Sequence, residues 1–120
     1  MYRLFVSAAA TAALAAALIV VPAWGATAKL SGEVGPGFHI DVEKGGKDVK
    51  TVKAGKYKIK VEDKSTFHNF HLIGPGVNKE ITTIGFVGTK TVIVKFSQKG
   101  KVTFVCDPHA TIMKATFTVT

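Results

Sequence analysis

The chain has 120 residues, of which 47% are hydrophobic, which is enough for one domain with a single core. Sixteen basic and eight acidic residues give a formal net charge of +8. The lysines are spread from Lys29 to Lys114 without a block of basic and aromatic residues, which argues against nucleic-acid recognition. We expect a monomer with a solvated positive surface that attracts acidic protein partners or anionic membrane faces.

Residues 1–28 have the pattern of an export signal. A basic start at Arg3 leads into an apolar run that ends at Val21, followed by a proline and small residues suited to signal peptidase. We expect cleavage; the alternative is an uncleaved membrane anchor, because no charge appears between Arg3 and Lys29. Residues 29–120 then form one exported domain that works in the periplasm or outside the cell, and it touches a membrane only if the N-terminal segment is retained.

The rest of the chain alternates between apolar and polar residues in short runs, the pattern of half-buried antiparallel strands. Glycine-containing turn signals separate these runs, and no stretch has helical periodicity. The side chains expected to face the core are Phe38, Ile40, Tyr57, Ile59, Val61, Val92, Val94, Phe96, Val102, Phe104, Cys106, Ala115, Phe117 and Val119. We therefore predict an all-β fold, a Greek-key β-sandwich of seven or eight strands.

The segment "FVCDPHATIMK" gathers three side chains that bind metals. Cys106 is the only cysteine of the chain, so it cannot form an internal disulfide. His109 follows it as C-x-x-H, and Met113 is the only methionine besides the first residue. Thiolate and thioether together are soft ligands that favour copper, so the loop predicts a copper site that needs one more strong ligand. The alternative for Cys106 and Met113 is ordinary core packing.

The stretch "STFHNFHLIGPGV" offers two candidates for that ligand. His68 shares one face of the predicted strand with Phe70 and Leu72, whereas His71 points to the other face. We therefore favour His68 and leave His71 as the alternative. His39 is predicted to be a surface residue, and together with His71 it is a candidate for a secondary copper-capture site.

The motifs "HNFHL" and "CDPHATIM" resemble those of the cupredoxin family, the plastocyanins and their small exported bacterial relatives. The resemblance implies one mononuclear copper with His68, Cys106 and His109 as equatorial ligands and Met113 as the axial ligand. It also implies that Asn69 braces the cysteine loop by hydrogen bonds.

Relatives dock their partners on an apolar patch around the loop histidine. The candidates for that patch here are Pro36, Gly74, Pro75, Val77, Phe86, Pro108 and Ala110.

Two features differ from the family pattern. Three residues separate His109 from Met113, whereas plastocyanin-like loops have four and amicyanin-like loops have two. Asp107 places a negative charge beside the thiolate, which favours Cu(II).

These features predict an exported blue copper protein that carries one electron between redox protein partners. The alternative is a protein that captures, buffers or delivers copper outside the cytoplasm, since both functions use the same ligands. We do not expect an enzyme, because copper oxidases and reductases need further histidine-rich centres and the chain has four histidines in all.

Overall fold

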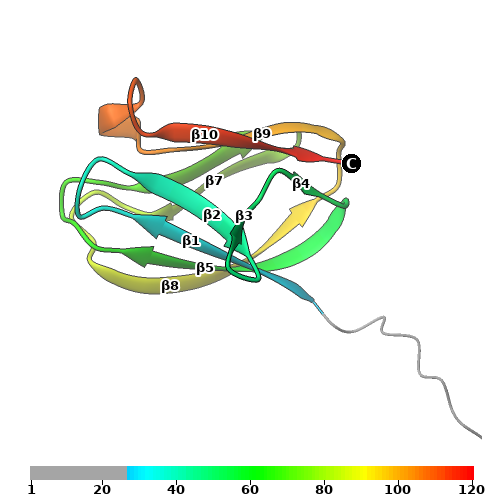
Figure 1. Cartoon of the computed structure of the whole chain (residues 1–120), viewed down its shortest axis with the longest axis horizontal. Coiled ribbons are helices and arrows are strands. Elements are labelled where there is room, and N and C mark those ends of the chain that lie inside the picture. The colour runs from blue at the N-terminus through cyan, green and yellow to red at the C-terminus, as the bar shows by residue number, and fades with distance from the viewer. Residues whose placement is uncertain (1–26) are drawn as a thin grey trace, which may run out of the picture.

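The structure is a computed structural model that describes residues 27–120, and these form a sandwich of two five-stranded β-sheets (Figure 1). The prediction of an all-β sandwich is confirmed. Residues 1–26 of the predicted export signal lie outside the described residues, so cleavage and anchoring stay predictions. Within residues 27–120 no helix is long and apolar enough to cross a membrane.

The first sheet has the strand order β3 (Lys47–Asp48), β2 (Ile40–Lys44), β1 (Ala28–Val34), β5 (Gly55–Asp63) and β8 (Gly88–Phe96). Strand β5 pairs antiparallel with β8, as its alternation predicted, but parallel with β1, which the sequence did not predict. The parallel pair brings the ends of β1 and β5 together at the same edge of the sandwich, because both strands run in the same direction.

The second sheet has the order β4 (Thr51–Val52), β10 (Lys114–Val119), β9 (Gly100–Val105), β6 (Phe70–Gly74) and β7 (Val77–Thr82). Strand β9 lies between β10 and β6 and is antiparallel to both. The described residues contain ten strands rather than seven or eight because β3 and β4, of two residues each, add to eight longer ones.

The inner faces of the two sheets enclose one core. Along β5, Tyr57, Ile59 and Val61 are buried while the lysines between them are exposed, as the alternation predicted. The largest side chains sealed in the core include Phe70, Phe96 and Phe117. Burial of each such side chain stabilises the fold by roughly 1.5–3 kcal/mol, which makes the sandwich a rigid support for its loops.

Two of the predicted core residues are exposed instead. Phe38 is 65% exposed because it lies in the connection before β2 rather than in the strand itself. Ala115 keeps the inward phase of Phe117 but lies beside an open hollow between β2 and β10, where the edges of the two sheets leave it uncovered. Alternation along the sequence predicts which face of the strand a side chain is on, but not whether another element covers that face.

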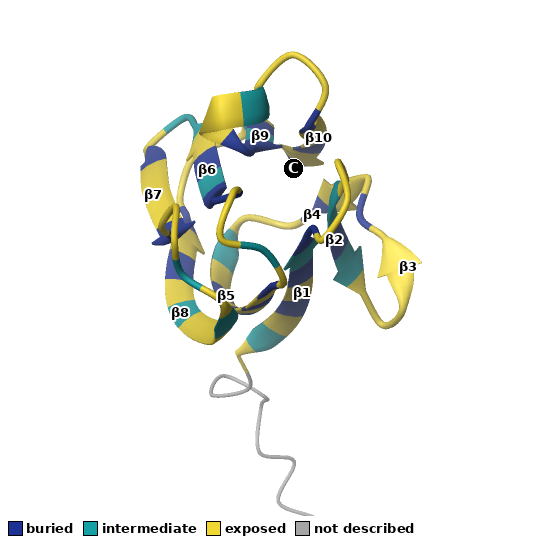
Figure 2. Cartoon of the chain, turned by 90° about the vertical axis from the view of Figure 1, so that its left-hand side faces the viewer, coloured by how far each residue is buried: buried dark blue, intermediate teal, exposed yellow. Residues whose placement is uncertain are grey.

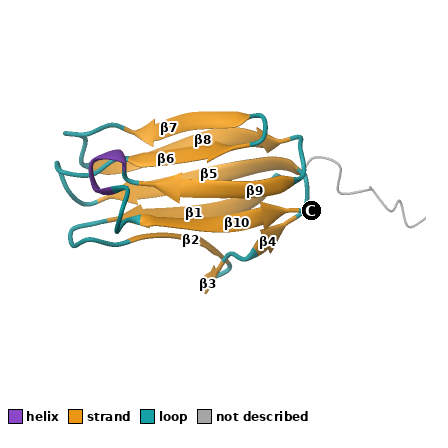
Figure 3. Cartoon of the chain, turned by 90° about the horizontal axis from the view of Figure 1, so that it is seen from above, coloured by secondary structure: helices purple, strands orange, loops and turns teal. Residues whose placement is uncertain are grey.

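Four connections gather at one end of the sandwich: residues 35–39, 64–69, 83–87 and 106–113. Backbone hydrogen bonds join some of them directly, for example from Gly85 N–H to the carbonyl of Thr66 at 3.1 Å. Figure 2 looks onto this end, and Figure 3 shows the short helical turn there with the C-terminus at the far end. The start of β1 also lies at the far end (Figure 1).

Candidate metal centre

The loop between β9 and β10 fixes three of the predicted ligands through its backbone. Cys106 donates its N–H to the carbonyl of Met113 at 3.0 Å, so these two residues face each other at the base of the loop. Asp107–His109 form the 3-10 turn η1, in which Pro108 is well placed because no N–H is needed there. His109 N–H donates to the Cys106 carbonyl at 3.0 Å, and Met113 N–H donates to the His109 carbonyl at 2.8 Å.

Three donor atoms converge where this loop meets the connection before β6. Cys106 Sγ lies 3.6 Å from Nδ1 of His68 and 3.6 Å from Nδ1 of His109, and the two Nδ1 atoms are 3.2 Å apart. A point equidistant from the three atoms is about 2.0 Å from each, close to the metal–nitrogen bonds of roughly 2.0–2.1 Å and metal–sulfur bonds of roughly 2.3 Å known for zinc. The three side chains are therefore arranged to hold one metal ion.

Burial separates these ligands from solvent to different degrees. Cys106 and Met113 are fully buried, and His68 is 2% exposed. His109 is half-buried. The thiol and the thioether are thus closed off, while one edge of the site reaches the surface through His109.

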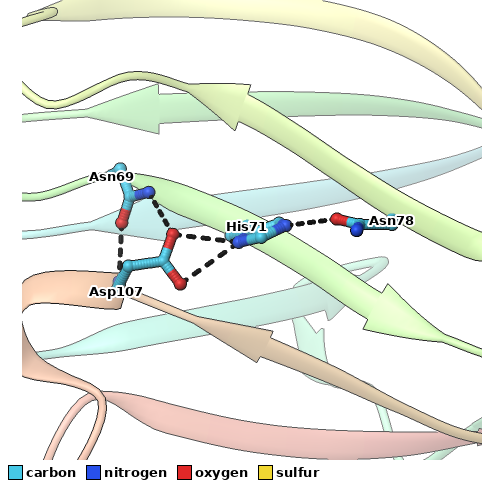
Figure 4. Close-up of polar contacts among 4 residues, drawn as sticks. All are labelled: Asn69, His71, Asn78 and Asp107. Carbon is cyan, nitrogen blue, oxygen red and sulfur yellow. Dashed lines mark hydrogen bonds and ion pairs between the residues drawn. The ribbon is translucent and has the colours of Figure 1, made fainter.

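Asn69 connects β6 to the ligand loop, as Figure 4 shows. Its Nδ2 donates to Asp107 Oδ2 at 2.7 Å, and its Oδ1 accepts the backbone N–H of Asp107 at 2.7 Å. Asn69 is 2% exposed, so both bonds are shielded from water on its side. Together they hold the residue after Cys106 against β6.

His71 lies outside the triangle of donor atoms, on the opposite face of β6 from Phe70 and Leu72. Its Nδ1 is 2.9 Å from Asp107 Oδ2, and its Nε2 is 2.6 Å from Asn78 Oδ1 (Figure 4). Burial alone would lower the pKa of His71, but the hydrogen bonds to Asn78 and Asp107 and the charges of Asp107 and Glu80 outweigh it and raise the pKa above its usual value.

His39 lies on the surface near the same end of the sandwich. Its Nε2 is 3.1 Å from Glu33 Oε1, which also accepts a hydrogen bond from Lys64 Nζ at 3.0 Å. The bond from Lys64 is the main reason why the pKa of Glu33 is lowered. Neither His39 nor His71 has a donor atom in the cluster formed by His68, Cys106 and His109.

Apolar side chains surround the exposed edge of the site. The ring of Phe38 packs edge-on against His109, with centroids 5.1 Å apart, and against His68 at 5.9 Å. The connection that carries Phe38 approaches closely: a Cβ on Gly35, whose φ is +73°, would lie 2.9 Å from His68 Cδ2. An open hollow of about 560 Å³ is lined by Pro36, Phe38, Ser65, Phe67, His68, Ile84, Pro108 and His109.

The patch predicted from the sequence is divided between the two ends of the molecule. Pro36 and Pro108 line the hollow beside His109. Gly74 and Pro75 lie in the hairpin between β6 and β7, beside Val102 and Gly100 at the end away from the site. Val77 is buried in the core. Phe38, Phe67 and Ile84 also belong to the apolar surface beside His109 but were not predicted. The available signal was the presence of large apolar residues in loops.

Comparisons with known proteins identify the family. The sequence profile described as copper binding proteins, plastocyanin/azurin family, matches residues 39–120. The chain belongs to this family. Membership confirms the resemblance to the cupredoxins, and no curated protein sequence matches the chain.

Several solved structures share the fold of the chain at low sequence identity. The copper protein rusticyanin matches 78% of this chain and 78% of its own, with a TM-score of 0.57 and 18% identity. Auracyanin A, a "blue" copper protein from Chloroflexus aurantiacus, matches 79% of this chain and 100% of its own, with a TM-score of 0.56 and 16% identity. A chain of a heme-copper terminal oxidase dimer matches 77% of this chain, which spans 63% of that one, with a TM-score of 0.54 and 18% identity.

The donor set fits the metal of the family. Two imidazole nitrogens and a thiolate sulfur at trigonal distances, with a thioether on the same loop, form the set that blue copper sites use. His68, Cys106, His109 and Met113 therefore make up a site for one copper ion in this cupredoxin. The prediction of copper is confirmed.

Proposed function

We propose that this cupredoxin is a one-electron carrier. The observation that carries the proposal is the spacing of 3.2–3.6 Å among the donor atoms of His68, Cys106 and His109, which the chain sets by its own packing and hydrogen bonds. Copper bound there supplies the change between two oxidation states. The residues of the chain hold their ligand atoms in one arrangement for both states, and little rearrangement means fast transfer.

The half-buried His109 is the proposed point of electron exchange with a partner. The hollow beside it offers an apolar surface that includes Phe38 and Phe67, which are 65% and 72% exposed. Large exposed apolar side chains gathered around one polar group are typical of interaction sites. We propose that a redox protein docks there as a transient partner, and that the positive charge of the chain favours an acidic one.

Copper capture or buffering has less support. That function drew on His71 and His39 as additional ligands, but each of them is hydrogen-bonded to a carboxylate in this structure. A catalytic role has no additional support either, since cupredoxins as a rule carry electrons and the four histidines of the chain leave too few for a further copper centre.

The N-terminal pattern and the family support a location outside the cytoplasm, in the periplasm or at the cell surface. The site and the start of β1 lie at opposite ends of the sandwich (Figure 1). A segment that tethers the chain through β1 would leave His109 facing away from the membrane. The proposal therefore accommodates both a cleaved and a retained N-terminal segment.

The test is the visible absorption and electron paramagnetic resonance spectrum of the Cu(II)-loaded protein, together with the rate of electron self-exchange. We expect an intense visible band that is lost in Cys106→Ser and kept in the matched surface variant His39→Gln. A pale protein whose spectrum does not respond to Cys106→Ser would refute a blue copper site. An intense band combined with very slow self-exchange would keep the copper site but reject the carrier in favour of copper buffering.

A further inference from the structure

Asp107 is held by Asn69, the residue before β6, and by His71, which lies in β6. Asn69 bonds both its side chain and its backbone N–H, at 2.7 Å each. His71 faces both carboxylate oxygens, with Nδ1 at 3.1 Å from Oδ1 and 2.9 Å from Oδ2. Figure 4 shows the carboxylate between the two side chains. Asp107 follows Cys106 directly, so whatever holds Asp107 also holds the start of the ligand loop.

His71 has a hydrogen-bond acceptor at each ring nitrogen. Nδ1 faces the carboxylate of Asp107, and Nε2 faces the side-chain oxygen of Asn78 on β7 at 2.6 Å. A neutral imidazole has one N–H and can donate to only one acceptor, whereas an imidazolium donates to both. The surroundings thus favour the charged form of the ring, and that charge balances the charge of Asp107.

The neighbours of His71 agree with a charged ring. Glu80 is its register partner on β7 and carries a negative charge. Val105, its partner on β9, is uncharged. Asp107 of the ligand loop is a second acidic neighbour, and Lys114 lies one strand further along the same register row, beyond Val105. The hydrogen bonds to Asn78 and Asp107 and the charges of Asp107 and Glu80 raise the pKa of His71.

We propose that His71 is a positioning residue: as an imidazolium it clamps the Asp107 carboxylate to β6, and through Asp107 it sets the place and the electrostatic environment of the Cys106 ligand. The effect of the clamp on the reduction potential rests on the proposed electron-carrier function, and it would make that potential depend on pH. This assignment replaces the earlier candidate role of His71 as a secondary copper ligand, because both of its nitrogens are used within the clamp.

The clamp has an electrostatic consequence for the copper site. While His71 is protonated, its charge offsets that of Asp107, and the pair is neutral. When His71 loses its proton, Asp107 leaves one negative charge next to Cys106. A negative charge favours the oxidised, more positive form of a redox site, so the reduction potential falls as the pH rises through the pKa of His71.

The experiment compares the full-length copper-loaded protein with His71→Gln, which keeps a side-chain donor but has no titratable charge. We expect the potential of the wild type to fall between about pH 6 and pH 9, since an ordinary histidine titrates near 6.5 and the pKa of His71 is raised. The variant should lose that fall and have, at every pH in this range, the potential that the wild type has at its alkaline end. His68 and His109 remain in both proteins, so the difference between the two profiles belongs to His71.

His39→Gln is the matched control, because it removes a histidine that also faces a carboxylate but lies outside the clamp. It should keep the profile of the wild type. A His71→Gln profile that runs parallel to the wild type, merely displaced, would overturn the proposal and leave His71 a purely structural residue. Equal loss of the fall in both variants would overturn it as well.

A second readout separates the clamp from the copper function. In the copper-free protein, nitrogen NMR of the histidine rings should show both nitrogens of His71 protonated at pH 7. Asn78→Ala should lower the pKa of His71 by removing one acceptor. If copper gave no blue site at all, the proposed function would fail while this readout still decided the clamp. A singly protonated, neutral His71 at pH 7 would refute the clamp whatever the copper spectrum.

Discussion

The Nδ1 atoms of His68 and His109 lie 3.2 Å apart, although 41 positions separate the two residues in the sequence. Their meeting follows from strand order, because β6 pairs with β9 and the two strands are antiparallel. The start of β6 and the end of β9 therefore reach the same edge of the sheet. His68, two residues before β6, and the loop after β9 are therefore brought together by the pairing of the strands before any metal binds.

Asn69→Ala tests how far side chains add to this arrangement. The change removes both hydrogen bonds of 2.7 Å that the buried Asn69 side chain makes to Asp107. We expect a loss of roughly 1–3 kcal/mol in the free energy of unfolding of the copper-free protein, measured with a chemical denaturant. Asn78→Ala is the control, because it removes one bond to the half-buried His71 and should cost less. Equal losses in both variants would show that Asn69 has no special role.

His71 should also make stability depend on pH. The pKa of His71 is raised in the folded protein, so the folded state binds the proton more tightly than the unfolded chain does. The stabilisation is fully present below about pH 6.5, the ordinary value, and is lost as the pH rises through the raised pKa. Denaturation at several pH values should show wild type and His71→Gln converging toward alkaline pH. A gap between the two proteins that stays constant from pH 5.5 to pH 9 would contradict this.

Much of the fold was predictable because the exposure of strand residues follows a local pattern. Tyr57, Ile59 and Val61 show the alternation of a strand that is covered on one side, and the structure buries all three. The pairing of β5 with β1 was not predictable, since a strand has the same alternation next to a parallel or an antiparallel neighbour. Pairing depends on contacts between distant segments, on which one short run carries no information.

The ligand loop was readable because its residues are close in sequence and chemically rare. Cys106, His109 and Met113 lie within eight positions, so a single loop had to bring them together. The residues that surround the ligands were harder to predict, because Phe38 contacts His109 from a connection that is distant in the sequence. The hairpin with Gly74 and Pro75 has the same Gly-Pro-Gly sequence as residues 35–37 beside the site. It lies at the opposite end of the sandwich, because β6 runs away from the site.

Gly32→Ala probes the packing beneath the site. Gly32 lies in β1, and a Cβ there would come within 2.9 Å of the buried ring of Phe70. Because Phe70 is fully enclosed, the ring has little room to move, and we expect a loss of about 1–3 kcal/mol in the free energy of unfolding. Gly37→Ala is the matched control, since a Cβ at Gly37 meets nothing within 4 Å. A Gly32→Ala protein as stable as the Gly37→Ala protein would mean that the core adapts at this point.

Met113→Leu examines the thioether separately from the other ligands. Leucine fills a similar volume in the core, so the fold should be kept, with a stability change below about 1.5 kcal/mol. We expect the visible band to persist, because Cys106 and the two histidines remain, and the reduction potential to rise, because Cu(II) loses a weak ligand. Voltammetry measures the shift, and Met113→Gln, which supplies an oxygen donor, should move the potential in the opposite direction. An unchanged potential in both variants would make Met113 a packing residue only.

The last prediction concerns which lysines steer a partner to His109. Among the described residues Lys64 is the one lysine in an ion pair, so the positive charge of the others is not offset by a neighbouring carboxylate. Lys114 follows Met113 at the site, whereas Lys58 lies five residues from Asp63 at the site end of β5. At about 3.3 Å per residue that is roughly 16 Å, well beyond the screening length of about 8 Å in 0.15 M salt.

Lys114→Glu and Lys58→Glu change the net charge equally and are therefore matched. In 0.15 M salt we expect Lys114→Glu to slow oxidation of the reduced protein by the anionic oxidant ferricyanide more than Lys58→Glu does, measured by stopped flow. At 0.01 M salt the screening length grows to about 30 Å, so the two variants should become similar and both slower than the wild type. Equal rates at 0.15 M would mean that electrons leave through a point equally distant from both lysines, which would place the exchange site away from His109.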